Sequence, residues 1–272
     1  MKTQLKIGLG IAVFVALIAS SASGQTKRTL YATTQDNRLA TIDIATSSSR
    51  TKTFSGLNIG ETMIGIDFGP RDGKLYGISN QNRIYTIDPS TAKASAIGMN
   101  AFSPSLVGTA FGMDFNPTVN RIRIHGNTGF NARFNQETGA MVDFDPNTAG
   151  TQPDLNLNYT DGGTAPMIAG TAYTNSNATA TSTVLYAIDS SRDVLVTVAP
   201  PNEGKLTVVG KLGVDTNEAV GFDISGASDG TAYATLTVNG SSKLYTIDLK
   251  TGKAKTMRLL GGLTVTGIAI AP

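Results

Sequence analysis

Short stretches in which apolar and polar residues alternate recur along most of the chain, and turns rich in Gly, Asn, Asp and Thr separate them. Residues 84–87, with the sequence Ile-Tyr-Thr-Ile, follow the pattern of a strand that buries one face. Beyond residue 24 we find no stretch with the period of an amphipathic helix. The pattern therefore predicts an all-β fold.

The strands belong to a repeated unit that is marked by the sequence Gly-x-Asp-Phe or a close variant of it. The steps between its successive glycines are 47, 58, 51 and 46 residues, and the glycines are Gly65, Gly112, Gly170, Gly221 and Gly267. Each unit continues with segments resembling Leu-Tyr and Tyr-Thr-Ile-Asp and with a further segment after a turn. Repeats of this length with several short strands are typical of β-propellers. The spacing predicts five four-stranded blades. Six blades remain the alternative, because the third unit is long enough to hold a degenerate blade.

The phase of the repeat predicts how the ring of blades closes. The chain after residue 24 begins with the second strand of a unit, at residues 30–34, and ends with the first strand of a unit, at residues 267–270. Together these pieces complete one blade, which pairs the two ends of the chain and removes two exposed sheet edges. The tyrosines that recur in the second strand are expected to pack between blades; they are Tyr31, Tyr76, Tyr186 and Tyr233.

The first 24 residues have the order of a secretory signal peptide. Lys2 and Lys6 precede a short apolar run, and small residues follow up to Gly24. A membrane anchor is the alternative, although the apolar run is shorter than the roughly 20 residues that a span requires. We expect a secreted protein, extracellular or periplasmic, with a single propeller domain at residues 25–272 and no membrane span after cleavage.

Composition excludes several classes of chemistry. The chain has no Cys, which excludes disulfides and thiolate metal sites, and its one histidine, His125, excludes multi-histidine metal sites. The 22 Lys and Arg residues include two in the signal peptide, and there are 20 acidic residues, so that the exported protein is close to neutral. A nucleic-acid-binding protein would be expected to carry a basic surplus. We therefore expect no nucleic-acid partner.

The chain from about Arg28 to Pro272 resembles a known family. The sequences that carry the resemblance lie at residues 65–70 (Gly-Ile-Asp-Phe-Gly-Pro), 73–77, 111–123 and 193–197. They are similar to those of the secreted, mostly bacterial family called domain of unknown function (DUF) 4394. Residues 130–133 depart slightly, with Phe-Asn-Ala-Arg where the family has a sequence closer to Gln-Asn-Leu-Arg. The resemblance implies a secreted, propeller-like domain and assigns no activity and no catalytic residue.

The third unit is the irregular one, and it contains a candidate calcium loop. Between Phe134 and Ser191 there are six acidic residues and no Lys or Arg. Oxygen-bearing side chains alternate in this stretch, as Ca²⁺ loops require. The candidate ligands are Asp143, Asp145, Asn147 and Asp154. An ordinary polar loop is the alternative, because Pro146 interrupts the spacing and the glycine of an EF-hand loop is absent.

Polar residues just upstream form a candidate ligand-binding patch for an anionic group or a sugar. They are Arg121, Arg123, Asn131 and Arg133. The alternative is that Arg121 and Arg123, two positions apart on one strand, simply face solvent. His125 lies in the same stretch and is the only residue that could serve as a histidine general base.

The aspartates of the repeat are a further candidate. Asp67, Asp114 and Asp223 occupy one blade position near the innermost strand, and alanines, Ala172 and Ala269, replace them in two units. They could form an incomplete ring of cation ligands around the axis. The alternative, which we favour, is that each aspartate accepts backbone N–H groups of the turn that follows it.

Three functions agree with these observations. The first is a secreted, non-enzymatic propeller that binds an extracellular protein or glycan partner through loops at one end. The second is a propeller glycoside hydrolase or lyase with a carboxylate pair drawn from the repeated aspartates and the acids of the third unit. The third is a structural component of the envelope or matrix.

Overall fold

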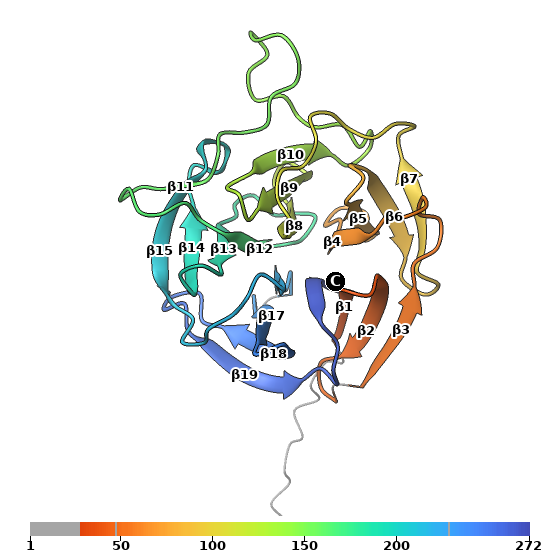
Figure 1. Cartoon of the computed structure of the whole chain (residues 1–272), viewed down its shortest axis with the longest axis vertical. Coiled ribbons are helices and arrows are strands. Elements are labelled where there is room, and N and C mark those ends of the chain that lie inside the picture. The colour runs from red at the N-terminus through yellow and green to blue at the C-terminus, as the bar shows by residue number, and fades with distance from the viewer. Residues whose placement is uncertain (1–27, 47, 228) are drawn as a thin grey trace, which may run out of the picture.

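The computed structural model describes residues 28–46, 48–227 and 229–272. The expected signal peptide at residues 1–24 lies outside this part of the chain. The described residues form five small sheets arranged in a ring, which is a five-bladed β-propeller (Figure 1). Apart from a single 3₁₀ turn at Pro201–Glu203, these residues contain no helix, and none that could cross a membrane. The all-β prediction is confirmed.

The blades follow one another around the ring in chain order. Blade 1 contains β20 (Val265–Ile270), β1 (Thr29–Thr34), β2 (Arg38–Asp43) and β3 (Ser49–Thr53), and blade 2 contains β4 (Met63–Phe68), β5 (Leu75–Ser79), β6 (Ile84–Asp88) and β7 (Lys93–Ile97). Blade 3 contains β8 (Phe111–Asn116), β9 (Arg121–Gly126) and β10 (Asn131–Asn135). Blade 4 contains β12 (Ile168–Tyr173), β13 (Leu185–Asp189), β14 (Val194–Val198), β15 (Lys205–Lys211) and, at its outer edge, β11 (Asn158–Tyr159). Blade 5 contains β16 (Val220–Ile224), β17 (Ala232–Val238), β18 (Ser241–Ile247) and β19 (Ala254–Leu259).

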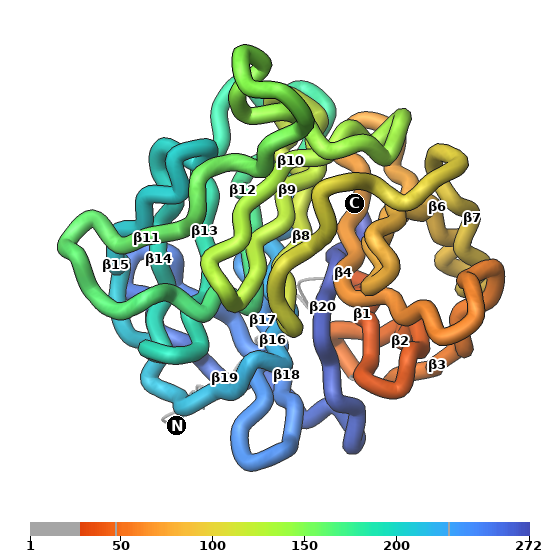
Figure 2. The backbone as a smooth tube through the Cα atoms, turned by 45° about the horizontal axis from the view of Figure 1, so that its top comes forward, coloured from red at the N-terminus to blue at the C-terminus, as the bar shows by residue number. Residues whose placement is uncertain are grey.

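The ring closes as the repeat predicts. Strand β20, the last of the chain, pairs antiparallel with β1, the first, so that Leu30 lies opposite Ile270 (Figure 2). Both ends of the propeller therefore belong to blade 1, and the backbone groups of β1 and β20 are hydrogen-bonded rather than exposed.

Blades 3 and 4 differ from the prediction of four strands each. In the described residues, the segment that follows the turn at Gly139 makes only an isolated bridge, between Phe134 and Met141, and blade 3 has three strands. The chain then runs outward at residues 142–157, which we call the insertion and which is seen in green in Figure 1. It returns as β11, which pairs in parallel with β15 of blade 4. Pro146 and Pro153 lie in this segment, and proline cannot donate to a β-ladder. The long third unit thus extends its neighbour and does not form a sixth blade.

The core lies between the blades, and aromatic residues of the repeat carry part of it. The rings of Tyr31 and Phe68 join blades 1 and 2, with 5.6 Å between their centroids. The rings of Tyr76 and Phe115 join blades 2 and 3 in the same way, at 5.0 Å. Edge-to-face pairs of this kind add about 0.5–1.5 kcal/mol to the area that they bury. The predicted packing of Tyr31 and Tyr76 between blades is confirmed.

The repeated glycines allow the five inner strands to approach one another at the axis. A Cβ atom on Gly112 would lie 2.5 Å from the backbone nitrogen of Thr171, in the next blade. A Cβ atom on Gly221 would lie 2.9 Å from the backbone nitrogen of Ile268. No side chain fits at such separations unless the strands move apart, and this explains why β8 and β16 need a glycine at this position.

We expect Gly112→Ala to lower the free energy of unfolding by about 2 kcal/mol, because the added methyl group must displace the backbone of blade 4. Urea denaturation measures the effect. Gly163→Ala is the matched control, since the atoms nearest to its Cβ belong to the flexible guanidinium of Arg192. We expect a loss of at most about 1 kcal/mol, from the contacts of that guanidinium with Thr164 and Tyr159. Equal losses in the two variants would contradict the requirement for glycine at the axis.

Candidate functional site

Three buried aspartates converge on the axis near one end of the propeller. Asp67, Asp114 and Asp223 lie on the inner strands β4, β8 and β16, and each is less than 5% exposed. One carboxylate oxygen from each residue lies within 4.8 Å of the corresponding oxygens of the other two. The repeat brings them together because they hold the same position in their blades. The described residues contain no other such group of three His, Asp or Glu residues.

Each aspartate also joins its blade to the next one. Asp67 Oδ2 accepts the N–H of Phe115 at 2.8 Å, and Asp114 Oδ1 accepts that of Tyr173 at 3.0 Å. Asp223 Oδ2 accepts the N–H of Ile270 at 2.6 Å, which links blade 5 to blade 1. The expectation that these carboxylates accept N–H groups of the following turn is wrong. Asp67 Oδ1 accepts the N–H of the next residue, Phe68, at 2.7 Å. The other partners named here are on the neighbouring inner strand, about 50 residues further along the chain.

Burial and mutual repulsion make the charged form of this cluster unfavourable. Burial, and then repulsion from Asp223, raises the pKa of Asp67 well above its ordinary value. Burial followed by repulsion from Asp67 and Asp223 does the same to the pKa of Asp114. Burial raises the pKa of Asp223 from 3.8 to about 6. The cluster is therefore a place where protons, a cation or a hydrogen-bonding ligand would be favoured.

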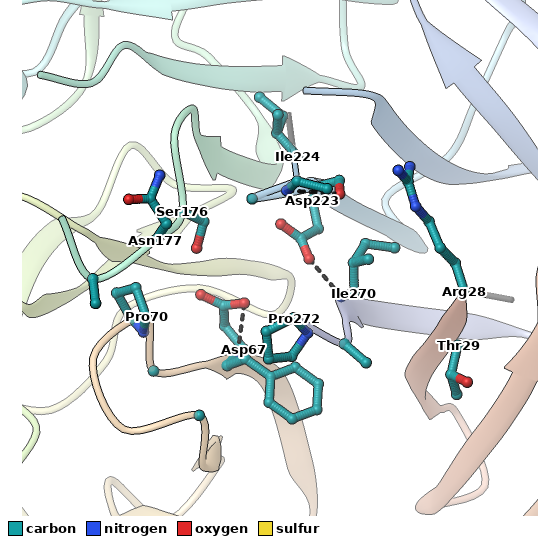
Figure 3. Close-up of a pocket in the computed structure, with 18 residues that line it drawn as sticks. Arg28, Thr29, Asp67, Pro70, Ser176, Asn177, Asp223, Ile224, Ile270 and Pro272 are labelled. Carbon is teal, nitrogen blue, oxygen red and sulfur yellow. Dashed lines mark hydrogen bonds between the residues drawn. The ribbon is translucent and has the colours of Figure 1, made fainter. Parts of the chain in front are cut away.

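Two of the three aspartates, Asp67 and Asp223, lie at the floor of a pocket of about 520 Å³ at this end of the axis. Figure 3 shows the carboxylates of Asp67 and Asp223 pointing toward each other, with Ser176 and Asn177 on one wall. Arg28 lies at another side of the pocket, where Asp229 engages it at 2.8 Å. The loop between β12 and β13 supplies Ser176 and Asn177, so that blades 1, 2, 4 and 5 all contribute to the pocket.

The three carboxylates have the chemistry of hard-cation ligands. Each can offer one oxygen to a shared point, and Ca²⁺ takes roughly six to eight oxygens. With three protein oxygens bound, the remaining coordination positions of the cation would face the pocket, which is open to solvent. A cation at this point would also offset the repulsion between the carboxylates. Any such site would be at the axis, and not in the third-unit loop.

The structure does not bring the predicted calcium ligands of the third unit together. Asp143 Oδ1 accepts the N–H groups of Asp145 and Gln152, and Asp145 Oδ1 accepts that of Asn147. These bonds stabilise the turns of the insertion. Asp154, the fourth predicted ligand, is buried and forms ion pairs elsewhere.

The partners of Asp154 are residues of the predicted ligand-binding patch. Arg123 and Arg133 lie directly opposite each other on β9 and β10, and both contact the carboxylate of Asp154, at 2.5 and 2.7 Å. Asn131 is also buried, and its Oδ1 accepts a bond from Arg123 at 2.7 Å. Arg121 is half-buried at the edge of this group and contacts Gln136.

This network fastens the insertion to blades 3 and 4. Arg123 Nη2 donates to Asn202 Oδ1 at 2.7 Å, and Asn202 belongs to the connection between β14 and β15. The alternative that Arg123 faces solvent is wrong, because its side chain is only 2% exposed. Alternation along β9 places Arg123 on the face that packs against blade 4, and the insertion then covers its guanidinium. The acid that pairs with it lies 31 positions away in the sequence.

His125 lies in the interior between blades 3 and 4. Its Nδ1 is 3.0 Å from Thr171 Oγ1, and its Nε2 has no hydrogen-bond partner. Burial, together with repulsion from Arg123, lowers the pKa of His125 well below its ordinary value. A neutral, fully buried imidazole has no access to a substrate, and we assign it no role as a general base.

Comparison with known proteins agrees with this architecture. A chain of the nidogen/laminin complex superimposes with a TM-score of 0.50 at 14% identity, covering 90% of this chain and 98% of that one. A protein of unknown function from Bacteroides thetaiotaomicron VPI-5482 gives a TM-score of 0.51 at 16% identity, covering 84% of this chain and 54% of that one. Both likenesses concern the fold alone. Among curated protein sequences there is no match. Residues 38–269 match the family described as domain of unknown function (DUF4394), and the chain therefore belongs to this family.

Proposed function

We propose that this protein is an exported, non-enzymatic β-propeller that binds an extracellular glycan in the axial pocket. The observation that carries the proposal is the pocket itself, which has the carboxylates of Asp67 and Asp223 at its floor (Figure 3). Its volume of about 520 Å³ falls in the range of small-molecule and oligosaccharide sites. The order of charged, apolar and small residues in residues 1–24 supports an exported protein.

The side chains of the pocket suit hydroxyl-rich ligands. Carboxylates accept hydrogen bonds from sugar hydroxyls, while Asn177 and Ser176 can both donate and accept. Phe68 and Pro70 give the same pocket an apolar wall, against which the carbon face of a sugar ring can pack. A ligand that donates to the aspartates would also offset their mutual repulsion.

A protein partner is the main alternative ligand. The solved chain of the nidogen/laminin complex shows that, in that protein, a similar fold takes part in a protein complex. We favour a glycan for this chain because the acidic residues lie in a concave pocket and not on a flat surface. A surface without a cleft would have favoured a purely structural role. The pocket therefore argues against that role.

Glycan binding can be tested with cellohexaose, xylohexaose, mannohexaose and chitohexaose. We expect at least one of them to bind by isothermal titration calorimetry, and we expect Ser176→Trp, which fills the pocket, to abolish that binding. Thr207→Trp, on the outer strand β15, is a control with the same bulk at an exposed position. Failure of all four probes, or equal binding by both variants, would overturn the proposal.

A hydrolase is the second candidate, because Asp67 and Asp223 line one pocket at a short separation. The pKa of about 6 for Asp223 would suit a general acid. Against this role, both oxygens of Asp67 and one oxygen of Asp223 already accept backbone N–H groups. The bonds from Phe115 and Ile270 join neighbouring blades. Release of reducing ends from a bound hexaose, lost in Asp223→Asn, would establish the hydrolase and overturn the non-enzymatic assignment.

A further inference from the structure

A second pocket lies at the opposite end of the axis, where the inner strands begin. Its volume is about 400 Å³, and four of the five blades contribute residues to it. Thr34 comes from the end of β1, Thr62 precedes β4, and Thr264 precedes β20. Because the aspartates lie near the other ends of β4, β8 and β16, this pocket shares none of the residues of the axial aspartate pocket.

The polar groups of the second pocket are almost all neutral. Threonine hydroxyls dominate, together with the side chains of Gln35 and Asn217. None of the described residues that line it is Lys, Arg or His, and its one acid, Glu218, accepts a bond from Asn127 at 2.9 Å. An anionic ligand would find no counter-charge here, and a cation would find only one carboxylate.

The remaining lining residues give the pocket an apolar side. Met63, Ile64 and Phe111 form it, at the starts of β4 and β8. An apolar side facing hydroxyl and amide groups matches a sugar ring, which has a carbon face and a rim of hydroxyls that both donate and accept. The hydroxyls of Thr34 and Thr109 already bond to protein groups. An apolar ligand would remove water from the other polar groups, among them the hydroxyls of Thr62 and Thr264, at a cost in binding free energy.

The two pockets are separated by the packed centre of the propeller. The glycines of the repeat meet there around a space of only about 10 Å³, which is too small for a ligand to pass. Their positions are Gly65, Gly112, Gly170, Gly221 and Gly267. Occupation of one pocket therefore leaves the other free.

We propose that the second pocket binds a neutral saccharide unit, so that one propeller can hold a glycan at each end of its axis. The proposal for the second pocket depends only on the residues that line it, among them Thr62 and Thr264. Only the bridging of two glycans rests on the proposed function of the aspartate pocket. A propeller with two such sites would link separate chains of a polysaccharide.

The test measures how many hexaose molecules bind to each protein chain by isothermal titration calorimetry, with the neutral probes cellohexaose, xylohexaose and mannohexaose. Wild type is expected to bind two. Thr264→Trp is expected to bind one hexaose, because its second pocket should have an affinity at least about tenfold weaker than that of wild type. Thr62→Arg, on another wall of that pocket, is the second variant, in case Thr264→Trp does not fold. Circular dichroism and thermal melts verify the fold of each variant.

The outcomes separate the two proposals. In one outcome, wild type binds a single hexaose, Ser176→Trp abolishes this binding, and Thr264→Trp and Thr62→Arg leave it unchanged. This result would overturn the second site and keep the first. Binding that is lost only in Thr264→Trp or Thr62→Arg would keep the second site and overturn the proposed function. If none of the three hexaoses binds, the second site is overturned.

Discussion

Asp154→Ala is expected to lower the free energy of unfolding by about 3–5 kcal/mol, because it leaves buried positive charge without a partner. Arg123 and Arg133 are cross-strand neighbours on β9 and β10, and the carboxylate of Asp154 lies between their guanidinium groups. Without it, the two arginines repel each other, and Arg123 remains in an interior where its side chain is 2% exposed. The insertion would also lose its strongest attachment to blade 3.

Chemical denaturation monitored by tyrosine fluorescence measures this loss. Asp161→Ala is the matched control, since it removes the same charge from an exposed position just after β11, and its expected effect is within about 0.5 kcal/mol. Asp154→Asn keeps the shape and one acceptor, and should fall between the two. A loss for Asp154→Ala no larger than that of the control would show that the network does not hold the insertion.

The stability of the protein is expected to fall as the pH rises from 4 to 7, when divalent cations are removed with EDTA. The folded-state pKa of Asp223 is raised from 3.8 to about 6, and the pKa values of Asp67 and Asp114 are raised as well. Groups with raised pKa values stabilise the fold fully below their unfolded pKa, and lose that contribution as the pH rises through the folded pKa. Asp223 alone accounts for roughly 3 kcal/mol.

The variant Asp114→Asn should flatten this pH dependence and unfold at a higher temperature than wild type at pH 7. The amide keeps an oxygen for the N–H of Tyr173 while removing one charge from the cluster. Asp88→Asn is the control, because the pKa of this exposed group is lowered to about 2 by the hydroxyl of Ser90, so that it stays ionised across the range. Stability that increases from pH 4 to 7 in wild type, or an unchanged slope in Asp114→Asn, would contradict the repulsion. If added Ca²⁺ removes the slope, the cluster binds that cation.

The candidate site could be found only in part from the sequence. The repeat placed Asp67, Asp114 and Asp223 at one blade position, and this alone suggested that they meet at the axis. Their hydrogen-bond partners could not be inferred, because Phe115, Tyr173 and Ile270 carry no distinctive signal and the bond uses their backbone N–H groups. The third unit was misleading for a related reason. The spacing of its acidic residues resembles a calcium loop, but Asp154 pairs with Arg123 and Arg133 of blade 3, and this long-range pairing cannot be inferred from spacing.

The propeller and the closure of the ring through blade 1 could be predicted from the amino-acid sequence, and five blades were the favoured number over six. These features follow from local causes: alternating apolar residues, turn residues and a glycine at each inner strand. The burial of Arg123, the extension of blade 4 by β11 and the pocket at each end of the axis became visible in the folded molecule alone. Each of these depends on which distant segments pack against one another. Burial and charge pairing are properties of that packing, and the spacing of residues along the chain does not specify them.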